Sequence, residues 1–193
     1  MPYLQPATNN IFGLQPAEGP QGRVNLYAVS SSEAVPILPG DAIVWTSVAT
    51  VRAAVSADTP ATIRLVGAAA DALSTASFSG VTYNLPVYDD PQQIFAIAVT
   101  TSAGLTITDY GKAFNILTSS TGTGVVSTAV SGGRSKHALH VVSASSGGYL
   151  RMVSLHPVEV FGASGFVVTT SAGKPQKYLV TPNVGVAYVP LTT

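Results

Sequence analysis

The stretch AVPILPGDAIVW, residues 34–45, carries the clearest fold signal in this chain. At its centre, Pro39-Gly40-Asp41 has the residue types of a tight turn. Proline fixes φ, glycine accepts positive φ, and aspartate binds nearby backbone N–H groups. A short apolar run, 42–46, follows the turn and is rich in residues that favour strands. The stretch therefore predicts a turn that leads directly into a β-strand.

The same pattern recurs along most of the chain. Short β-branched, aromatic and apolar runs alternate with Gly, Pro, Asn, Asp or Ser, as in proteins built from short strands. In RVNLYAV, residues 23–29, Val24 and Leu26 fall on one face of the expected strand. Helix signals are few: GAAADALSTA, 67–76, predicts at most two turns, and DYGKAF, 109–114, a short helix. We therefore predict an all-β fold, with a single β-barrel or β-sandwich domain.

Proline divides the chain into three parts. Four prolines within residues 1–22 fix φ and remove backbone donors, so this segment is predicted to form an extended N-terminal arm. Residues 23–157 are predicted to form the β-barrel or β-sandwich core, since Pro157 ends a strand. Residues 158–193 are predicted to form a β-rich C-terminal extension. A length of 193 residues fits one domain with such additions.

The charge content of the chain is low. Nine basic and nine acidic residues make up 9% of the sequence and, apart from the adjacent Asp89 and Asp90, are scattered singly. Without a basic stripe, nucleic-acid binding is not expected. No apolar run approaches the roughly 20 residues of a membrane span, so we expect no membrane partner, and no signal peptide at the N-terminus. Few charges remain to keep copies apart, which predicts that a partner covers much of the surface.

Apolar side chains are spaced along the predicted arm. A solvated tail would not usually carry so many, so we expect the arm to lie on a surface. Contact with a partner and an arm folded back on its own domain are both open. The candidate contact residues are Tyr3, Leu4, Ile11, Phe12 and Leu14.

The stretch VYDDPQQIFAI, residues 87–97, places two adjacent carboxylates before a proline. Neighbouring side chains on a strand point to opposite faces, so Asp89 and Asp90 are poorly placed to share a proton or an ion. Aspartate before proline is typical of a turn, in which its side chain binds backbone N–H groups. We therefore interpret Asp89, Asp90 and Pro91 as a structural turn, in preference to a metal or catalytic site.

Other candidates for chemistry are weak. The absence of cysteine excludes disulfides, thiolate metal sites and a cysteine nucleophile. His137 and His140, in KHALH, would lie on opposite faces of a strand and would not share a metal ion. No GxSxG elbow or phosphate-binding loop is present. We predict no catalytic residue, no metal site and no cofactor, and a protein that is not an enzyme.

Three groups of segments carry a resemblance to a known family: VPILPGDAIVW (35–45) with TIRLVGAAA (62–70), LPVYDDPQQIFAIAV (85–99), and TDYGKAFNI (108–116) with GRSKHAL (133–139). They resemble the decoration, or cement, proteins of tailed-bacteriophage capsids. The chain departs from the family pattern where acidic residues are expected around the Phe that follows the Tyr-Asp-Asp-Pro run, since Gln92, Gln93 and Ala96 stand there. The resemblance covers roughly residues 22–157.

The resemblance implies a structural protein of the virion. Such a protein is made in the host cytoplasm, binds the outer capsid surface, and stabilises the mature shell by bridging copies of the major capsid protein. It also contacts neighbouring copies of itself, and a trimer is one habit of the family. Other virion components, such as a tail tube, fibre or head-completion protein, are the alternative. A carbohydrate-binding β-sandwich is a further one, with a candidate cluster of Tyr83, Asn84, Tyr88 and Asp89.

Overall fold

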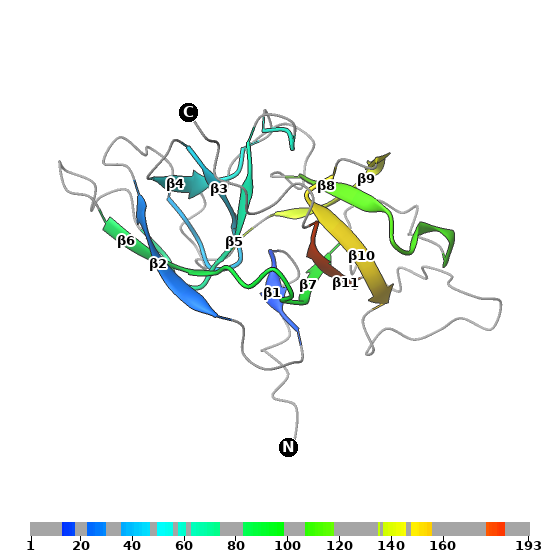
Figure 1. Ribbon diagram of the computed structural model, residues 1–193, viewed down its shortest axis with the longest axis horizontal. Helices are drawn as coiled ribbons and strands as arrows, with labels where there is room; N and C mark the ends of the chain where they lie inside the picture. Colours follow the sequence, from blue (N-terminus) through cyan, green and yellow to red (C-terminus); the bar gives the residue numbers. More distant parts are fainter. Residues whose placement is uncertain are drawn as a thin grey trace, which may run out of the picture.

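The computed structural model shows an all-β chain (Figure 1). A closed five-stranded barrel stands beside a six-stranded antiparallel sheet, and the residues described contain no α-helix. The predicted fold class is therefore confirmed. Within the same residues, no helix is long and apolar enough to cross a bilayer. The structure describes residues 13–17, 23–29, 36–46, 50–55, 58–60, 63–73, 83–98, 107–117, 135, 137–145, 148–155 and 177–183.

The barrel is built from strands of three to six residues. Their order around the barrel is β2-β4-β3-β5-β6, with β6 returning to β2. Neighbouring strands are antiparallel except β2 and β4, which run parallel and pair only at Val29 and Val51. The barrel is thus closed most weakly between β2 and β4. The strands are β2 (Val24–Val29), β3 (Ala42–Trp45), β4 (Val51–Ala53), β5 (Leu65–Ala69) and β6 (Tyr83–Tyr88).

The sheet joins distant parts of the chain. Its strand order is β1-β7-β11-β10-β8-β9, so β11, from the predicted C-terminal extension, is an interior strand. β1, from the predicted arm, is an edge strand that pairs with β7. The boundaries predicted after residues 22 and 157 fall outside the described residues. The strands are β1 (Gln15–Pro16), β7 (Phe95–Ala98), β8 (Ala113–Leu117), β9 (Ala138–Ser145), β10 (Leu150–Leu155) and β11 (Lys177–Pro182).

The turn before β3 has the geometry that its sequence predicts. Gly40 has φ of 87°, a value that glycine adopts without steric cost. The Asp41 N–H donates to the Leu38 carbonyl at 2.9 Å, and the Asp41 carboxylate accepts the Leu38 N–H at 2.8 Å. Both bonds close the turn, and β3 begins at the next residue.

Both weak helix predictions are wrong in the part of the chain that the structure describes. Residues 67–69 belong to β5, and a Cβ on Gly67 would lie 1.9 Å from the Tyr88 carbonyl oxygen. This close backbone approach requires glycine, and the small alanines beside it fit fully buried positions. Around 109–114, a three-residue 3-10 turn, η2 (Ile107–Asp109), precedes β8. Packing between strands therefore overrides the helix propensity of alanine.

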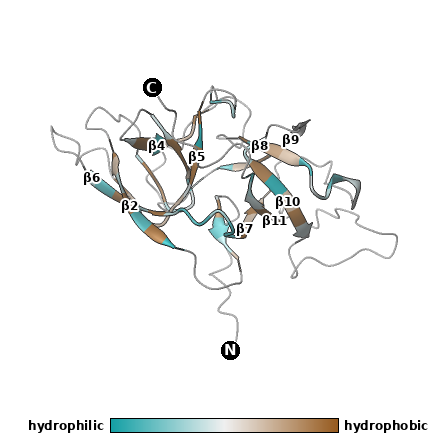
Figure 2. Cartoon of the chain, in the orientation of Figure 1, coloured by the Kyte–Doolittle hydropathy of each residue, from teal (hydrophilic) through white to brown (hydrophobic). Residues whose placement is uncertain are grey.

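Two hydrophobic cores hold the fold. One fills the barrel, and the other lies between the outer face of β3 and β5 and the inner face of the six-stranded sheet. Figure 2 shows hydrophobic residues along β4, β5 and β10. Barrel and sheet thus share buried side chains and pack as one unit. The barrel core includes Val29, Ile43, Val51, Val66, Leu85 and Val87, and the shared core includes Val44, Leu65, Phe95, Phe114, Met152 and Tyr178.

Candidate interaction surface

A polar cluster joins β2 to the end of β6. Arg23, directly before β2, and Asn25 and Tyr27, within it, lie at alternate positions and project to one side. The Asp89 carboxylate accepts bonds from Arg23 Nε at 2.9 Å, Asn25 Nδ2 at 2.8 Å and Tyr27 Oη at 2.5 Å. A second Arg23 nitrogen lies 3.3 Å from Asp89 Oδ2. Asp89 is only 1% exposed, whereas the Arg23 side chain is 60% exposed. Asp89 therefore fastens two strands at the rim of the barrel.

The cluster shifts the acidity of its members. Burial by itself raises the pKa of Asp89, but hydrogen bonds from Arg23, Tyr27 and Asn25 outweigh it and hold that pKa below its ordinary value. Burial, together with the bond to Asp89, raises the pKa of Tyr27 to about 12. At neutral pH the cluster thus contains an ionised Asp89 and a neutral Tyr27 that donates to it.

The turn after β6 begins at Asp90. Its carboxylate accepts the Gln92 N–H at 2.9 Å, and its carbonyl accepts the Gln93 N–H at 3.0 Å. With Pro91 in the second position, this is the local geometry in which an Asp-Pro pair favours a turn. Asp89 has a different role from the predicted one, since its carboxylate binds side chains of β2 instead of the turn backbone. The two adjacent carboxylates have separate partners.

The candidate sugar-binding cluster does not converge. Both carboxylate oxygens of Asp89 accept bonds from within the chain. Tyr83 pairs with Val29 on the barrel-core side, whereas Asn84 and Tyr88 fall on the opposite face of β6. Tyr88 also packs against the core shared with the sheet. These four side chains do not form one aromatic and polar surface.

Leu14 is the one candidate arm contact that lies within the described ranges. It is 1% exposed and belongs to the core between barrel and sheet. The Leu14 N–H donates to the Gly40 carbonyl at 2.8 Å, and the Gly13 N–H donates to the His137 carbonyl at 2.7 Å. This part of the arm therefore folds back on its own domain. Tyr3, Leu4, Ile11 and Phe12 lie outside the described residues.

His137 lies at the junction of barrel and sheet. Its Nδ1 accepts the Ala42 N–H at 2.9 Å, and its Nε2 lies 3.7 Å from a carboxylate oxygen of Asp41. Burial lowers the pKa of His137, and the nearby Asp41 only partly opposes this effect. The imidazole is therefore neutral at neutral pH and acts as a hydrogen-bond acceptor for the first residue of β3. Its partners make it a structural histidine.

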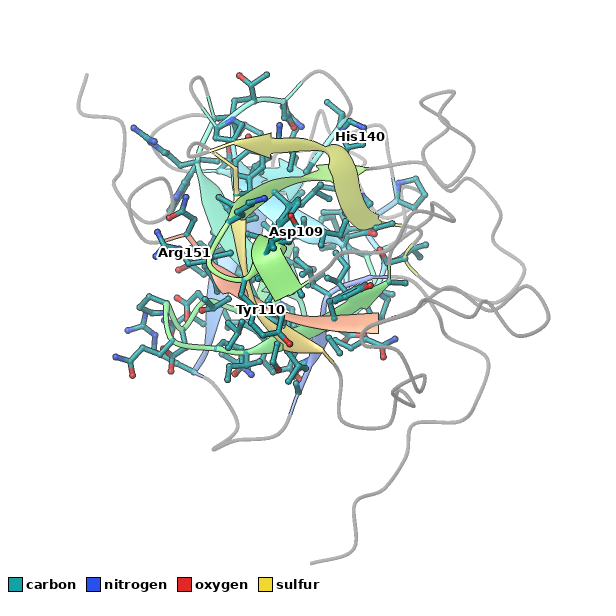
Figure 3. The ribbon with its side chains drawn as sticks, turned by 90° about the vertical axis from the view of Figure 1, so that its right-hand side faces the viewer. Asp109, Tyr110, His140 and Arg151 are labelled. Atoms are coloured by element: carbon teal, nitrogen blue, oxygen red, sulfur yellow. The ribbon has the colours of Figure 1, made fainter. Side chains whose placement is uncertain are left out.

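Polar residues at the sheet end of the molecule are spread out. Figure 3 shows His140 on β9, Arg151 on β10, and Asp109 and Tyr110 near η2, at separate positions on this side. The Lys112 ammonium binds the Asp109 carboxylate at 2.8 Å. Across the described ranges, no group of three or more His, Cys, Asp or Glu side chains is placed to hold a metal ion.

A groove of about 430 Å³ lies on the outer face of the six-stranded sheet. Arg151, Val153 and Thr181 alternate with core residues along β10 and β11, so they face away from the barrel. The Val153 side chain is 42% exposed. The Asn183 amide donates to the Gly148 carbonyl at 2.9 Å and accepts a longer, 3.4 Å bond from Arg151. The lining residues include Pro91, Ile94, Arg151, Val153, Thr181 and Asn183.

The face of β2 that the sequence pattern leaves undecided is resolved by the structure. Val24 and Leu26 are 45% and 67% exposed, whereas the Arg23 and Asn25 side chains, which alternate with them, bind Asp89. The alternation in RVNLYAV identifies two faces but not which one is buried. A sequence signal for the buried face would be a strand with polar residues at alternate positions, paired with a second strand that ends at an aspartate. Here the aspartate is the buried Asp89, at the end of β6, which binds the polar side chains of β2.

Comparisons with protein-family models, with curated proteins and with solved structures gave no match to this chain. Its function is therefore inferred from its surfaces and from the resemblance of its sequence segments.

Proposed function

We propose that this chain is a structural virion protein that binds the outer surface of a phage capsid and bridges major capsid subunits. The proposal gives the chain no catalytic residue and no cofactor. The observation that carries it is the groove on the sheet, where the exposed Val153 lies beside Arg151. The sequence resemblance to decoration proteins supplies the identity of the bound surface.

The groove offers the mixed chemistry that a protein segment requires. Val153, Pro91 and Ile94 can bury apolar side chains, while Arg151 and Thr181 can bind carboxylates or backbone carbonyls. A concave surface of this kind, on the rigid face of a sheet, suits a loop that projects from a shell subunit. Arginine is also enriched among the residues that dominate protein–protein binding energy.

Many weak contacts are sufficient for this function. A protein that binds only the closed, mature lattice lowers the free energy of that state by an amount set by its affinity and concentration. When one molecule contacts two neighbouring subunits, the second contact is intramolecular and therefore strengthened. A nearly uncharged surface avoids the desolvation of unpaired charges on contact.

Capsid melting tests the proposal. Purified chain is added to expanded tailed-phage capsids that lack a decoration protein, and shell melting is followed by calorimetry. The melting temperature is expected to rise, and the Arg151→Glu, Val153→Asp double variant is expected to bind at least about tenfold more weakly. Asn84→Asp, on the exposed face of β6, serves as the matched control and should bind normally.

Two outcomes would contradict the proposal. One is a capsid melting temperature that does not change at saturating concentrations of the chain. The other is equal binding by the groove variant and the Asn84 control. Deletion of residues 1–12, which leaves Leu14 and β1 in place, is expected to weaken binding if the predicted arm contacts the shell.

A further inference from the structure

Among the residues that the structure describes, the backbone groups on the outer edge of β2 have no partner strand at Val24 and Leu26. The Asp89 N–H donates to the Arg23 carbonyl at 3.2 Å, and the register pairs Val24 with Tyr88 and Leu26 with Pro86. Hydrogen-bonded pairs alternate along an antiparallel ladder, so Val24 and Leu26 are in non-hydrogen-bonded pairs with β6. Their N–H and C=O groups therefore point away from β6, toward the side of β4.

β4 does not cover these groups. It pairs with β2 only at Val29 and Val51, so among the described strands none lies beside Val24 and Leu26 on this side. Pro86, which lies opposite Leu26 on β6, agrees with this direction of the backbone groups. It has no N–H, and its carbonyl points away from β2 and accepts the Ala70 N–H at 2.9 Å, on the side of β5. Two donors and two acceptors are thus available for a further strand.

The side chains on this edge are also unprotected. Val24 and Leu26 are 45% and 67% exposed, and Val24–Ala28 contains no proline and no charged residue. Natural proteins usually protect an exposed edge with a charge, a proline or a very short strand. β1 has this protection, since it consists of only two residues and ends at Pro16. The edge of β2 lacks all three kinds of protection, as expected of an edge that pairs with a further strand.

We propose that two copies of this chain pair through β2, antiparallel, about a two-fold axis beside Asn25. In this register Val24 of each copy lies opposite Leu26 of the other copy. The N–H and C=O groups of Val24 and Leu26 in one copy then bind the C=O and N–H groups of Leu26 and Val24 in the other copy, which gives four hydrogen bonds. The two exposed apolar side chains of each copy pack against their counterparts on one face.

The register fits a second copy in three respects. Antiparallel pairing of one segment with itself is necessarily two-fold, so the contact is closed and uses one patch twice. A register shifted by one residue toward Ala28 would place the partner next to Val29, which already pairs with β4. The two Arg23 side chains lie about 14 Å apart, at four residues' separation along the strand, and each binds its own Asp89.

This inference does not depend on binding to a capsid, because the pairing occurs in solution. The contact is small, so a weak dimer is expected, with dissociation in the micromolar to millimolar range. On a surface with many binding sites, such a weak contact between neighbours would be strengthened by their fixed proximity.

Disulfide trapping tests the register. The chain has no cysteine, so Val24→Cys and Leu26→Cys variants each carry a single thiol. Directly opposed residues in a hydrogen-bonded pair have Cα atoms about 5.5 Å apart, within the range of a disulfide. Like residues face each other only diagonally, at about 7–8 Å. Under mild oxidation, an equimolar mixture should therefore form covalent dimer at least about tenfold faster than either variant by itself.

Two controls keep this test decisive. Val153→Cys, exposed on the groove side of the sheet, should not cross-link at a comparable rate with either β2 variant. Circular dichroism melting establishes that each variant is folded. If either β2 variant cross-links with itself as fast as the mixture does, or Val153→Cys cross-links equally well, the proposed pairing is wrong.

Sedimentation of the unmodified chain provides an independent measurement. Between about 10 µM and about 1 mM, the mass should approach twice 19.7 kDa. Leu26→Lys places a charge within the contact, opposite Val24 of the other copy, and should raise the dissociation constant at least about tenfold, whereas Val153→Lys should leave it unchanged. A strict monomer, or a trimer that Leu26→Lys does not affect, would overturn the inference.

Discussion

The rim of the barrel and the junction between barrel and sheet hold their polar groups in opposite ways. At the rim, Asp89 is ionised and accepts bonds from two side chains of β2 and from Arg23, just before β2, whose side chain remains 60% exposed. At the junction, His137 is fully enclosed and neutral, and its imidazole accepts one backbone N–H, from Ala42. At the rim a buried carboxylate stays ionised, whereas at the junction a buried imidazole stays neutral.

The difference follows from access to water. A charge that retains a solvated partner and several hydrogen bonds loses little of its stabilisation on folding. The His137 imidazole, enclosed between the two layers, would have to be desolvated as an ion, so it stays neutral instead. The rim can therefore present a surface to a partner without loss of its own structure, whereas the junction only holds barrel and sheet together.

The largest effect is expected where the junction is most tightly packed. Phe114 is fully buried in the core that barrel and sheet share. Phe114→Ala should lower the free energy of unfolding by about 3–5 kcal/mol, because the cavity cannot close fully between two sheets. Urea denaturation measures the loss. The exposed Val153→Ala is the matched control and should change the value by less than about 0.5 kcal/mol.

At the rim, the two adjacent carboxylates should differ in importance. Asp89→Ala leaves Tyr27 and Asn25 without their acceptor and should cost about 2–3 kcal/mol of unfolding free energy. Asp90→Ala removes only a turn contact with the Gln92 N–H and should cost about 0.5–2 kcal/mol. Thermal melting of both variants measures the difference. Equal losses would show that Asp89 does not fasten β2 to β6.

Acid should affect the junction before the rim. The pKa of His137 is lowered in the folded state, so between that pKa and about 6.5 the unfolded chain binds more protons. The His137 contribution to stability is therefore constant above about pH 6.5 and decreases as the pH is lowered below that value. The pKa of Asp89 is lowered too, but its contribution is lost only below about pH 3.8.

Hydrogen exchange separates the two responses. From about pH 7 to about pH 5, protection of the Ala42 amide, bound to His137, should decrease relative to that of the Asp89 amide, bound to the Arg23 carbonyl. His137→Gln should abolish the dependence. Uniform loss of protection at both amides would contradict the proposed difference between the regions.

The smallest effect is expected from one hydroxyl at the rim. Tyr27→Phe removes a 2.5 Å bond to Asp89 and should cost about 0.5–1.5 kcal/mol at neutral pH. The raised pKa of Tyr27, about 12, means that this contribution is present below about pH 10 and is lost as the pH rises through the folded-state value. Melting temperatures of both proteins should therefore converge at high pH.

The fold class could be predicted from the sequence because it depends on local signals. Pro39-Gly40-Asp41 determines a turn, and the apolar residues after it determine a strand, with no information from elsewhere in the chain. The alanines at 68 and 69 mislead for the opposite reason: their strand conformation depends on the close approach of Gly67 to Tyr88. The conformation of this segment therefore depends on packing against a part of the chain that is distant in sequence.

The interaction surfaces were less predictable. Alternation in β2 defines two faces, but only the position of Asp89, more than sixty residues away, determines that Val24 and Leu26 are exposed. Likewise, the place of Leu14 in a proline-rich segment makes it a candidate partner contact. In the structure, β1 pairs with β7 at the edge of the sheet, and Leu14, next to β1, lies in the core. Such outcomes depend on topology, which no short motif encodes.

Electron cryo-microscopy of phage capsids mixed with the chain tests the proposed function most directly. The expected result is additional density at equivalent positions on the outside of the mature shell, with the sheet face that contains Arg151 and Val153 turned toward major capsid subunits. A shell with no added density, or density confined to the tail, would contradict the proposed role.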